Sequence, residues 1–408
     1  MILTPFLDDA DVILYAGDCI EVMARMPGSS VDAIVTDPPY GLEFMGKGWD
    51  GFGTPLGFQT WTEAWAVEAF RVLKPGGHLL AFAGTRTYHR MASGVEDAGF
   101  EIRDCIAWMY GSGFPKSLDV SKAIDKAAGA EREVIGTRTD VATRIYDNGK
   151  GDRLPSLIDV TAPATPEAKD WNGWGTALKP AFEPVVVARR PLIGTVAANV
   201  LEHGTGALNI DACRISTDDS WSNTRRTALG IMNDDGWQPK ETLAETHRAG
   251  RWPANVALDA TAAKMLDEQS GEITSGMMKA RTNREACKGG AIYGQDQRNI
   301  VAGDTYADTG GASRFFYTAK ASRQDRNVGG LADNTHPTVK PTDLMRWLIR
   351  LVTPPGGIIL DPFGGSGSTG LAARAENVRC ILIEREPEYL QIIRDRLAQQ
   401  NLFAERAE

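Results

Sequence analysis

The segment VDAIVTDPPY, residues 31–40, joins a short apolar run to a stiff polar turn. Up to Thr36 the run is apolar except for Asp32, a pattern typical of a strand buried on both faces of a parallel sheet. Two consecutive prolines cannot continue a strand, so the motif Asp37-Pro38-Pro39-Tyr40 begins at its carboxyl end. Open α/β sheets bind their ligands at that edge, which makes the motif a candidate site.

A second segment of similar design, GIILDPFGGSG, occupies residues 357–367. Its glycines let the backbone approach a ligand closely and tolerate positive φ. Glu384 ends the next expected strand, where nucleotide-binding α/β folds place an acid on ribose hydroxyls. Residues 365–370 also match the GxGxxG pattern of dinucleotide sites, but Asp361-Pro362-Phe363 is not part of that fingerprint. The sequence therefore favours a nucleotide-like cofactor other than a dinucleotide.

The residues of the first motif suit methyl transfer to an exocyclic amine of a base. Such an amine is a poor nucleophile because its lone pair is delocalised into the ring. A carboxylate from Asp37 and the carbonyl of Pro38, each accepting one N–H bond, would localise that lone pair. Tyr40 offers a face on which a flipped base can stack. The alternative for this motif alone is a Pro-Pro strand terminator with an N-cap aspartate.

Composition narrows the class of protein. The 408 residues are 42% hydrophobic and 24% charged, which indicates a soluble protein with more than one domain. No run of about 18 apolar residues is present, and the N-terminal segment lacks a signal core, so we expect a cytoplasmic protein. Five scattered cysteines without a CxxC pair predict reduced thiols. Five histidines without i, i+4 spacing predict no metal site.

One basic stretch stands out against the net charge of −9. Between Lys279 and Arg326 nine basic residues face five acidic ones, a local charge of +4. A solvated loop surface is the ordinary explanation of such a stretch. Its position between the two motifs also favours contact with DNA phosphates.

Alternating strand and helix patterns predict an α/β fold with a parallel sheet covered by helices on both faces. The pattern fails over residues 113–182 and becomes loop-rich over 195–335. Strands are expected at residues 12–16, 31–36, 78–83, 100–110, 185–188, 207–210, 358–360 and 379–383. Helices are expected at residues 19–26, 60–73, 86–98, 260–269, 342–352, 368–375 and 387–398.

Taken together, the two motifs resemble those of S-adenosylmethionine-dependent DNA amino-methyltransferases that act on adenine N6 or cytosine N4. Their order, with the Asp-Pro-Pro-Tyr block before the donor-binding block, is similar to the beta class of that family. His336-Pro337-Thr338-Val339-Lys340-Pro341 resembles the leading donor-binding motif of the class. Residues 179–184 and 250–255 resemble recurring phrases of phage and prophage members, some of which serve in restriction–modification.

The resemblance assigns roles to individual residues. Thr338 and Lys340 would meet the methionine carboxylate of S-adenosylmethionine, and Asp18 would contact its adenine amine. The catalytic set would be Asp37, Pro38, Pro39 and Tyr40. The remaining cofactor-binding set would be Asp361, Pro362, Phe363, Gly364, Gly365, Gly367 and Glu384.

The resemblance also implies a doubly wound, Rossmann-like methyltransferase sheet that is circularly permuted, with the first strand beside the strand that ends at Glu384. Residues 1–194 would form the first part of the catalytic domain, including the irregular 113–182. Residues 336–408 would form its second, donor-binding part. The inserted residues 195–335 would be a loop-rich α+β target-recognition domain.

The implied reaction is direct in-line methylation of a flipped base in double-stranded DNA, in the cytoplasm near the nucleoid. Aspartate at position 37 favours adenine N6, and cytosine N4 is the alternative. An RNA methyltransferase or a protein-amide methyltransferase is a more distant alternative, since the latter typically carries Asn before Pro-Pro-Tyr. The resemblance also allows a homodimer.

Overall fold

The computed structural model describes residues 3–9, 11–42, 50–113, 117–144, 155–216, 225–233, 236–244, 250–274, 309–319 and 339–404. The chain divides into two compact units. The larger comprises Met1–Met109 with Glu183–Glu408, and the smaller comprises Tyr110–Phe182.

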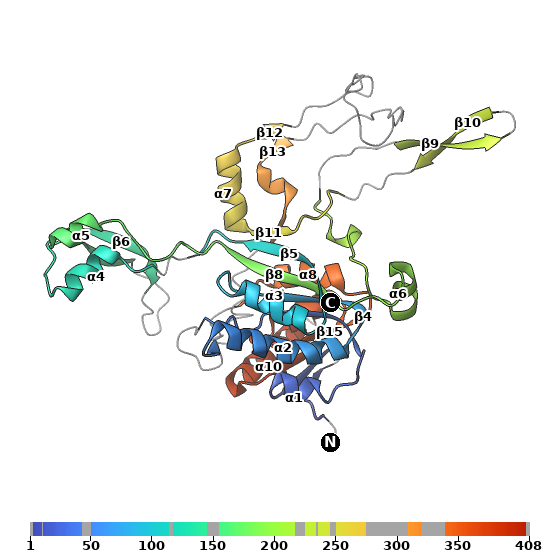
Figure 1. The fold of residues 1–408 in the computed structure, drawn as a ribbon, viewed down its shortest axis with the longest axis horizontal. Coiled ribbons are helices and arrows are strands. Elements are labelled where there is room, and N and C mark those ends of the chain that lie inside the picture. Colours follow the sequence, from blue (N-terminus) through green and yellow to red (C-terminus); the bar gives the residue numbers. More distant parts are fainter. Residues whose placement is uncertain are drawn as a thin grey trace. The chain divides into compact units, whose positions relative to one another are not determined.

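In its described part, the larger unit carries a ten-stranded sheet in the order β1-β2-β16-β15-β3-β4-β8-β5-β11-β14. Figure 1 labels β15, β4, β8, β5 and β11 of this sheet. The strands are β1 (Leu7–Asp9), β2 (Val12–Ala16), β3 (Val31–Thr36), β4 (Leu73–Phe82), β5 (Glu101–Met109), β8 (Phe182–Arg189), β11 (Val256–Asp259), β14 (Tyr317–Ala319), β15 (Ile358–Asp361) and β16 (Arg379–Glu384).

The centre of this sheet is parallel and permuted, which confirms the expected fold. β2, β16, β15, β3 and β4 are parallel neighbours, so the last two strands of the chain lie between the second and the third. The strand that ends at Glu384 pairs with β2, as expected. β8 runs antiparallel to β4, and β11 is parallel to both β5 and β14.

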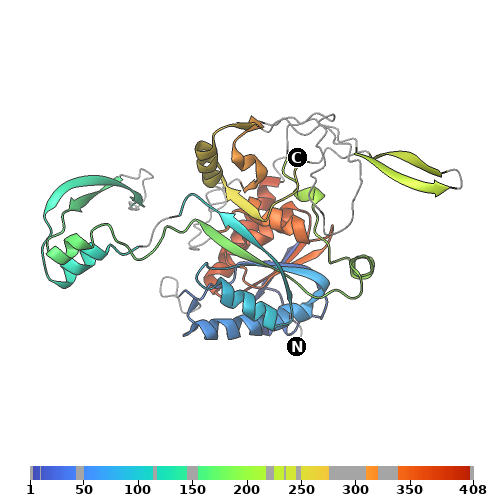
Figure 2. The same ribbon diagram turned by 45° about the horizontal axis from the view of Figure 1, so that its top comes forward.

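Two helical layers cover the sheet. α1 and α3 contact α2 in one layer, whereas α8 and α10 contact α9 in the other. Figure 2 shows the blue helices α2 and α3 on one side of the sheet and the orange to red C-terminal helices on the other. These helices are α1 (Cys19–Met23), α2 (Pro55–Val72), α3 (Tyr88–Asp97), α8 (Thr342–Val352), α9 (Ser368–Ala375) and α10 (Pro387–Ala404).

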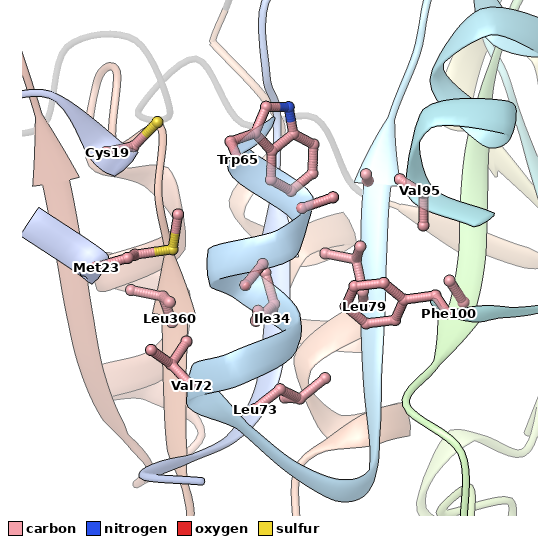
Figure 3. Close-up of a cluster of buried hydrophobic side chains, with 14 of the residues drawn as sticks. Cys19, Met23, Ile34, Trp65, Val72, Leu73, Leu79, Val95, Phe100 and Leu360 are labelled. Atoms are coloured by element: carbon pink, nitrogen blue, oxygen red, sulfur yellow. The ribbon is translucent and has the colours of Figure 1, made fainter. Parts of the chain in front are cut away.

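Helix α2 shows how the sequence builds the core. Thr54 caps it by accepting a hydrogen bond from the backbone N–H of Gly57, and Pro55 begins the first turn. Its buried residues recur at helical spacing and pack with side chains of α1, β3 and β4 (Figure 3). The fully buried members of this cluster include Met23, Ile34, Trp65, Val72, Leu73, Leu79, Val95 and Leu360.

Several expectations about local structure were wrong. The strand expected at 78–83 begins at Leu73, and the helix expected at 387–398 extends to Ala404. α2 begins at Pro55 instead of residue 60, because the Thr54 cap lies upstream of the strongly periodic positions. Residues 207–210 form no strand: the N–H of Asn209 bonds the carbonyl of Leu351, and the N–H of Ile210 closes a turn onto Leu208. Their amides are therefore used in a turn against the end of α8 and not in a sheet.

The irregular residues 113–182 correspond closely to the smaller unit. It pairs β6 (Val134–Arg144) with β7 (Pro155–Thr161) and adds α4 (Val120–Ala127) and α5 (Pro166–Asp170). The buried carboxylate of Asp125 organises it. That carboxylate lies 2.7 Å from the guanidinium of Arg132 and accepts hydrogen bonds from the backbone N–H of Ala164 and of Thr165.

The described part of residues 195–335 does not separate as a compact unit of its own, because β11 and β14 extend the main sheet. It also contains α6 (Val196–His203), α7 (Ala260–Ser270), the pair β9 (Arg225–Asn233) and β10 (Gly236–Ala244), and the pair β12 (Ile273–Thr274) and β13 (Thr309–Gly310). Its assignment to target recognition stays a prediction. Within the described residues, no helix is both long and apolar enough to span a membrane.

Candidate functional site

The predicted motifs meet at one edge of the sheet. β2, β16, β15 and β3 are consecutive neighbours. Their carboxyl ends present, in that order, Asp18, Glu384, the glycine turn 361–367 and the Asp37–Tyr40 turn. The candidate donor-binding residues thus lie on three adjacent strands, and the candidate target-base residues follow on the fourth.

Asp37, Tyr40 and Lys340 form a compact polar cluster. Lys340 Nζ lies 2.7 Å from Asp37 Oδ2, and the hydroxyl of Tyr40 donates to Asp37 Oδ1 at 2.8 Å. Lys340 Nζ also donates to the Tyr40 hydroxyl at 3.1 Å and lies 4.8 Å from the ring centroid of Phe82. Within the turn, Pro38 is buried and Pro39 half-buried. The lysine that the resemblance places on the methionine carboxylate therefore contacts Asp37, the predicted catalytic aspartate, in this structure.

Glu183 is a fourth member of this cluster. Its Oε2 accepts a hydrogen bond from the Tyr40 hydroxyl at 2.9 Å and lies 3.1 Å from Lys340 Nζ. The sequence places Glu183 in the phrase 179–184 but gives it no role. Only the antiparallel direction of β8, which brings its first residues to the carboxyl end of β4, reveals the contact.

Burial and charge fix the protonation states in this cluster. Burial alone lowers the pKa of Lys340, but the carboxylates of Asp37 and Glu183 outweigh burial and raise that pKa above its usual range. Burial and the same two carboxylates raise the pKa of the Tyr40 hydroxyl well above its usual range. Lys340 is therefore an ammonium and Tyr40 a neutral phenol at physiological pH.

The turn that carries Tyr40 is held by two further side chains. The carboxylate of Asp50, which is almost fully buried, accepts hydrogen bonds from the backbone N–H of Gly41 at 2.7 Å and of Leu42 at 3.0 Å. Thr87 Oγ1 donates to the carbonyl of Tyr40 at 2.6 Å. The turn is thus fixed in place before any substrate binds.

Asp361 braces the glycine turn from beneath. Its carboxylate is 2% exposed and accepts hydrogen bonds from Thr36 Oγ1 at 2.6 Å, Thr369 Oγ1 at 2.5 Å and the N–H of Phe363 at 3.0 Å. Burial raises its pKa to about 7, although these hydrogen bonds act in the opposite direction. Asp361 therefore shapes the cofactor turn from inside the protein.

Glu384 ties the turn to the neighbouring strand. Its carboxylate accepts hydrogen bonds from the N–H of Gly365 and of Glu386, both at 2.7 Å, and burial raises its pKa. Its backbone carbonyl accepts from the N–H of Gly17 at 3.0 Å. Next to Gly17, Asp18 Oδ1 caps α1 through the N–H of Ile20.

The glycines of this turn have distinct structural reasons. Gly365 and Gly367 adopt φ of +52° and +80°, which side chains disfavour. A Cβ on Gly367 would also lie 3.2 Å from Ile393, and one on Gly364 would lie 3.3 Å from the carbonyl of Ile383. Pro362, Gly364 and Gly367 are buried, so Phe363 and Gly365 are the partly exposed residues at 361–365. A side-chain-free backbone beside Asp18 and Glu384 fits a nucleoside-containing donor.

Several predicted residues lie elsewhere. Thr338 lies outside the described residues, as does the basic stretch 279–326 except for residues 309–319. Within that part, Phe315 packs beneath the guanidinium of Arg314 at 4.3 Å. Tyr317 stacks on Trp347 with ring centroids 4.9 Å apart. Tyr317 therefore packs within the protein, whereas Phe315 stays 41% exposed. Among the described residues no three His, Cys, Asp or Glu side chains are grouped to hold a metal ion.

Comparison with known proteins shows a family. A family model described as DNA methylase, of the N6/N4 methyltransferase type, matches residues 31–136 and 159–395. The Type II methyltransferase M.HindIII of Haemophilus influenzae is 22% identical over 421 aligned positions, 94% of each chain. The Type II methyltransferase M.XycI of Xanthomonas campestris pv. cyanopsidis is 38% identical over 103 residues, which are 22% of this chain and 34% of M.XycI. The solved PvuII DNA methyltransferase (cytosine-N4-specific) aligns with 96% of this chain and 88% of its own, at 15% identity and a TM-score of 0.45.

Proposed function

Because the chain belongs to the N6/N4 family of DNA methylases, we propose that it methylates the N6 amino group of adenine in double-stranded DNA. As a DNA methyltransferase of this family it uses S-adenosylmethionine as methyl donor. The observation that carries the proposal is that the Asp37–Tyr40 turn follows β3 and the glycine turn follows the neighbouring strand β15, so the two turns lie at the same edge of the sheet.

S-adenosylmethionine, when bound, supplies an electrophilic methyl group on a sulfonium. Asp37 and the carbonyl of Pro38 accept the two N–H bonds of the target amine and so localise its lone pair toward that methyl group. Tyr40 stacks on the flipped base. As the N–C bond forms and the S–C bond breaks, the nitrogen becomes positively charged, and its surplus proton leaves through the hydrogen bond to Asp37 to solvent.

The donor site is proposed to lie over the ends of β2, β16 and β15. There the backbone of the 361–367 turn approaches the nucleoside, Glu384 faces the ribose hydroxyls and Asp18 the adenine amine. Thr338 and Lys340 are proposed to reach the methionine carboxylate. The three N–H donors of Lys340 face Asp37, Tyr40 and Glu183 in this structure, so binding the methionine carboxylate would require Lys340 to exchange one of these partners for it.

Aspartate at the first motif position is the reason to propose adenine N6, since serine there is more typical of cytosine N4 enzymes. Cytosine N4 methylation is the second candidate. The deciding measurement is mass spectrometry of nucleosides from unmethylated genomic DNA incubated with the protein and S-adenosylmethionine. N6-methyladenine supports the proposal, and N4-methylcytosine replaces it with the second candidate.

The role of the motif is tested with Asp37→Ala. Transfer of tritiated methyl groups to duplex DNA should collapse, while calorimetry should show unchanged binding of S-adenosylmethionine. The matched control is Asp211→Ala, because Asp211 is an exposed aspartate in a surface pair with Arg214. Near-normal transfer by Asp37→Ala, or transfer to RNA in preference to DNA, would overturn the proposal.

We further propose that residues 195–335 recognise the target sequence and that the basic stretch 279–326 contacts phosphates. Neutralising its arginines should weaken binding to all duplexes alike and flatten the dependence of affinity on salt. An unchanged salt dependence would mean that the stretch is an ordinary solvated surface that does not contact DNA phosphates. We also propose that the protein acts in the cytoplasm at the nucleoid, where its proposed substrate lies. Sedimentation can show whether it acts as a homodimer.

A further inference from the structure

Asp37 and Glu183 compete for the same two hydrogen-bond donors. Both carboxylates lie within hydrogen-bond distance of the Tyr40 hydroxyl and of Lys340 Nζ, at 2.7–3.1 Å. Lys340 has three N–H donors and can serve both acceptors together with the Tyr40 oxygen. Tyr40 has a single hydroxyl proton, so it can make one strong bond at a time, to one carboxylate or to the other.

The two carboxylates reach this position from different strands. Asp37 follows β3, whereas Glu183 belongs to β8, which runs antiparallel to β4 with Val185 opposite Phe82. The N–H of Ala83 bonds the carbonyl of Pro184 and fixes the start of β8 at the end of β4. Glu183 therefore stands on a rigid element, with a side chain 22% exposed beside a Lys340 side chain that is 8% exposed.

The charges of the cluster do not balance. One ammonium stands between two carboxylates, which leaves one surplus negative charge beside Asp37. In the proposed reaction positive charge passes to the amine nitrogen that Asp37 holds. A surplus negative charge in a partly buried site favours that change more than a neutral ion pair would.

From this arrangement we propose that Glu183 is a positioning residue for methyl transfer, acting through Tyr40 and Lys340 to keep Asp37 free for the target amine. When the amine binds Asp37, the Tyr40 hydroxyl rotates and donates its hydrogen bond to Glu183. Lys340 then pairs with the Glu183 carboxylate in place of Asp37. No buried donor loses its partner in the exchange. This inference rests on the proposed role of Asp37.

Two substitutions separate acceptor from charge. Glu183→Gln keeps an oxygen that accepts from Tyr40 but removes the charge, and Glu183→Leu removes both. The single-turnover rate of methyl transfer to unmethylated genomic DNA, at saturating S-adenosylmethionine, should fall roughly tenfold in Glu183→Gln and roughly 100-fold in Glu183→Leu. The dissociation constant of S-adenosylmethionine should stay within about threefold in Glu183→Gln.

The matched control is Glu101→Gln. Glu101 is also paired with a cation of β8, Arg189 at 2.6 Å, but it lies at the far end of that strand from Glu183. Its substitution should leave the transfer rate unchanged. A common loss in both variants would mean that any charge pair along β8 has this effect, and would overturn the proposal.

A double-mutant cycle tests the route through Tyr40. In a Tyr40→Phe background the hydroxyl no longer competes for Asp37, so Glu183→Leu should cost much less of the rate than it does in the wild type. Additive losses would overturn the proposal, because a purely structural role for Glu183 needs no hydroxyl. If Glu183→Leu fails to fold, Glu183→Gln decides alone, and a rate within threefold of wild type would refute the inference. Activity of Asp37→Ala would instead refute the proposed function itself.

Discussion

Thr36 Oγ1 donates a hydrogen bond of 2.6 Å to Asp361 Oδ1 between the neighbouring strands β3 and β15. Both side chains are buried. Thr36 immediately precedes the Asp37 motif, and Asp361 is the first residue of the glycine turn. Besides the backbone pairing of β3 and β15, this bond joins the starts of the two turns below the surface, so we expect a shift of either turn to affect the other.

Thr36→Val should weaken both halves. It preserves the shape of the side chain but leaves the buried Asp361 carboxylate with one donor fewer, at a cost of about 1–3 kcal/mol in the free energy of unfolding. Urea denaturation measures this cost. Thr62→Val is the control, because the equally buried Thr62 hydroxyl bonds only the neutral carbonyl of Phe58 in its own helix. An equal loss in both variants would show that Asp361 does not depend on this donor.

The raised pKa of Asp361, about 7 in the folded protein, predicts a dependence of stability on pH. Between about pH 4 and pH 7 the unfolded chain has ionised this carboxyl and the folded chain has not. The group therefore contributes full stability below about pH 4 and loses it as the pH rises through 7. Asp361→Asn should remove this contribution. From pH 5 to pH 7.5 the free energy of unfolding should fall more in the wild type than in Asp361→Asn. An equal fall in both proteins would contradict the raised pKa of Asp361.

Gly367, in the glycine turn, and Gly356, outside it, allow backbone strain and side-chain packing to be told apart. Gly367→Ala combines a φ of +80° with a Cβ 3.2 Å from Ile393, whereas Gly356→Ala has a similar φ of +69° and no atom within 4 Å. Gly356→Ala should cost about 1 kcal/mol of unfolding free energy. Gly367→Ala should cost more and weaken the binding of S-adenosylmethionine in calorimetry. If both variants lost the same unfolding free energy and bound S-adenosylmethionine equally well, the packing of Gly367 against Ile393 of α10 would be unimportant.

Asp50→Ala should lower the rate of methyl transfer without weakening the binding of S-adenosylmethionine. It frees the N–H groups of Gly41 and Leu42, so the turn that carries Tyr40 is no longer fixed. We expect the transfer rate to fall roughly 100-fold, as for a displaced reacting group, with S-adenosylmethionine binding retained. Loss of both together would place Asp50 among residues that hold the whole fold.

Many strands of the larger unit could be predicted from the sequence because they are short, apolar and bounded by Gly or Pro. Helices 342–352 and 368–375 have the expected bounds, since a Pro-rich turn and the glycine turn delimit them. The pairing of β2 with β16 followed from the resemblance and was confirmed. The strand expected at residues 207–210 was wrong because local apolar content does not show whether backbone groups bond within a sheet or within a turn.

The sequence predicts neighbours in the candidate site where one turn carries them, but not where distant segments complete the cluster. Asp37 and Tyr40 belong to one motif and are hydrogen-bonded. Glu183 depends on the direction of β8, and Asp50 on how the loop after Tyr40 returns. The donor-binding role of Lys340 stays a prediction, and the sequence did not indicate that its ammonium contacts Asp37.

The place of β15 and β16 between β2 and β3 also has a consequence for biosynthesis. The ribosome therefore synthesises β15 about 320 residues after β3, and β16 later still. Until then both earlier strands expose unpaired apolar edges, which invite association with other chains. A nascent chain that stops before Ile358 should therefore require chaperone protection, and enzymatic competence should arise only in a late, cooperative step.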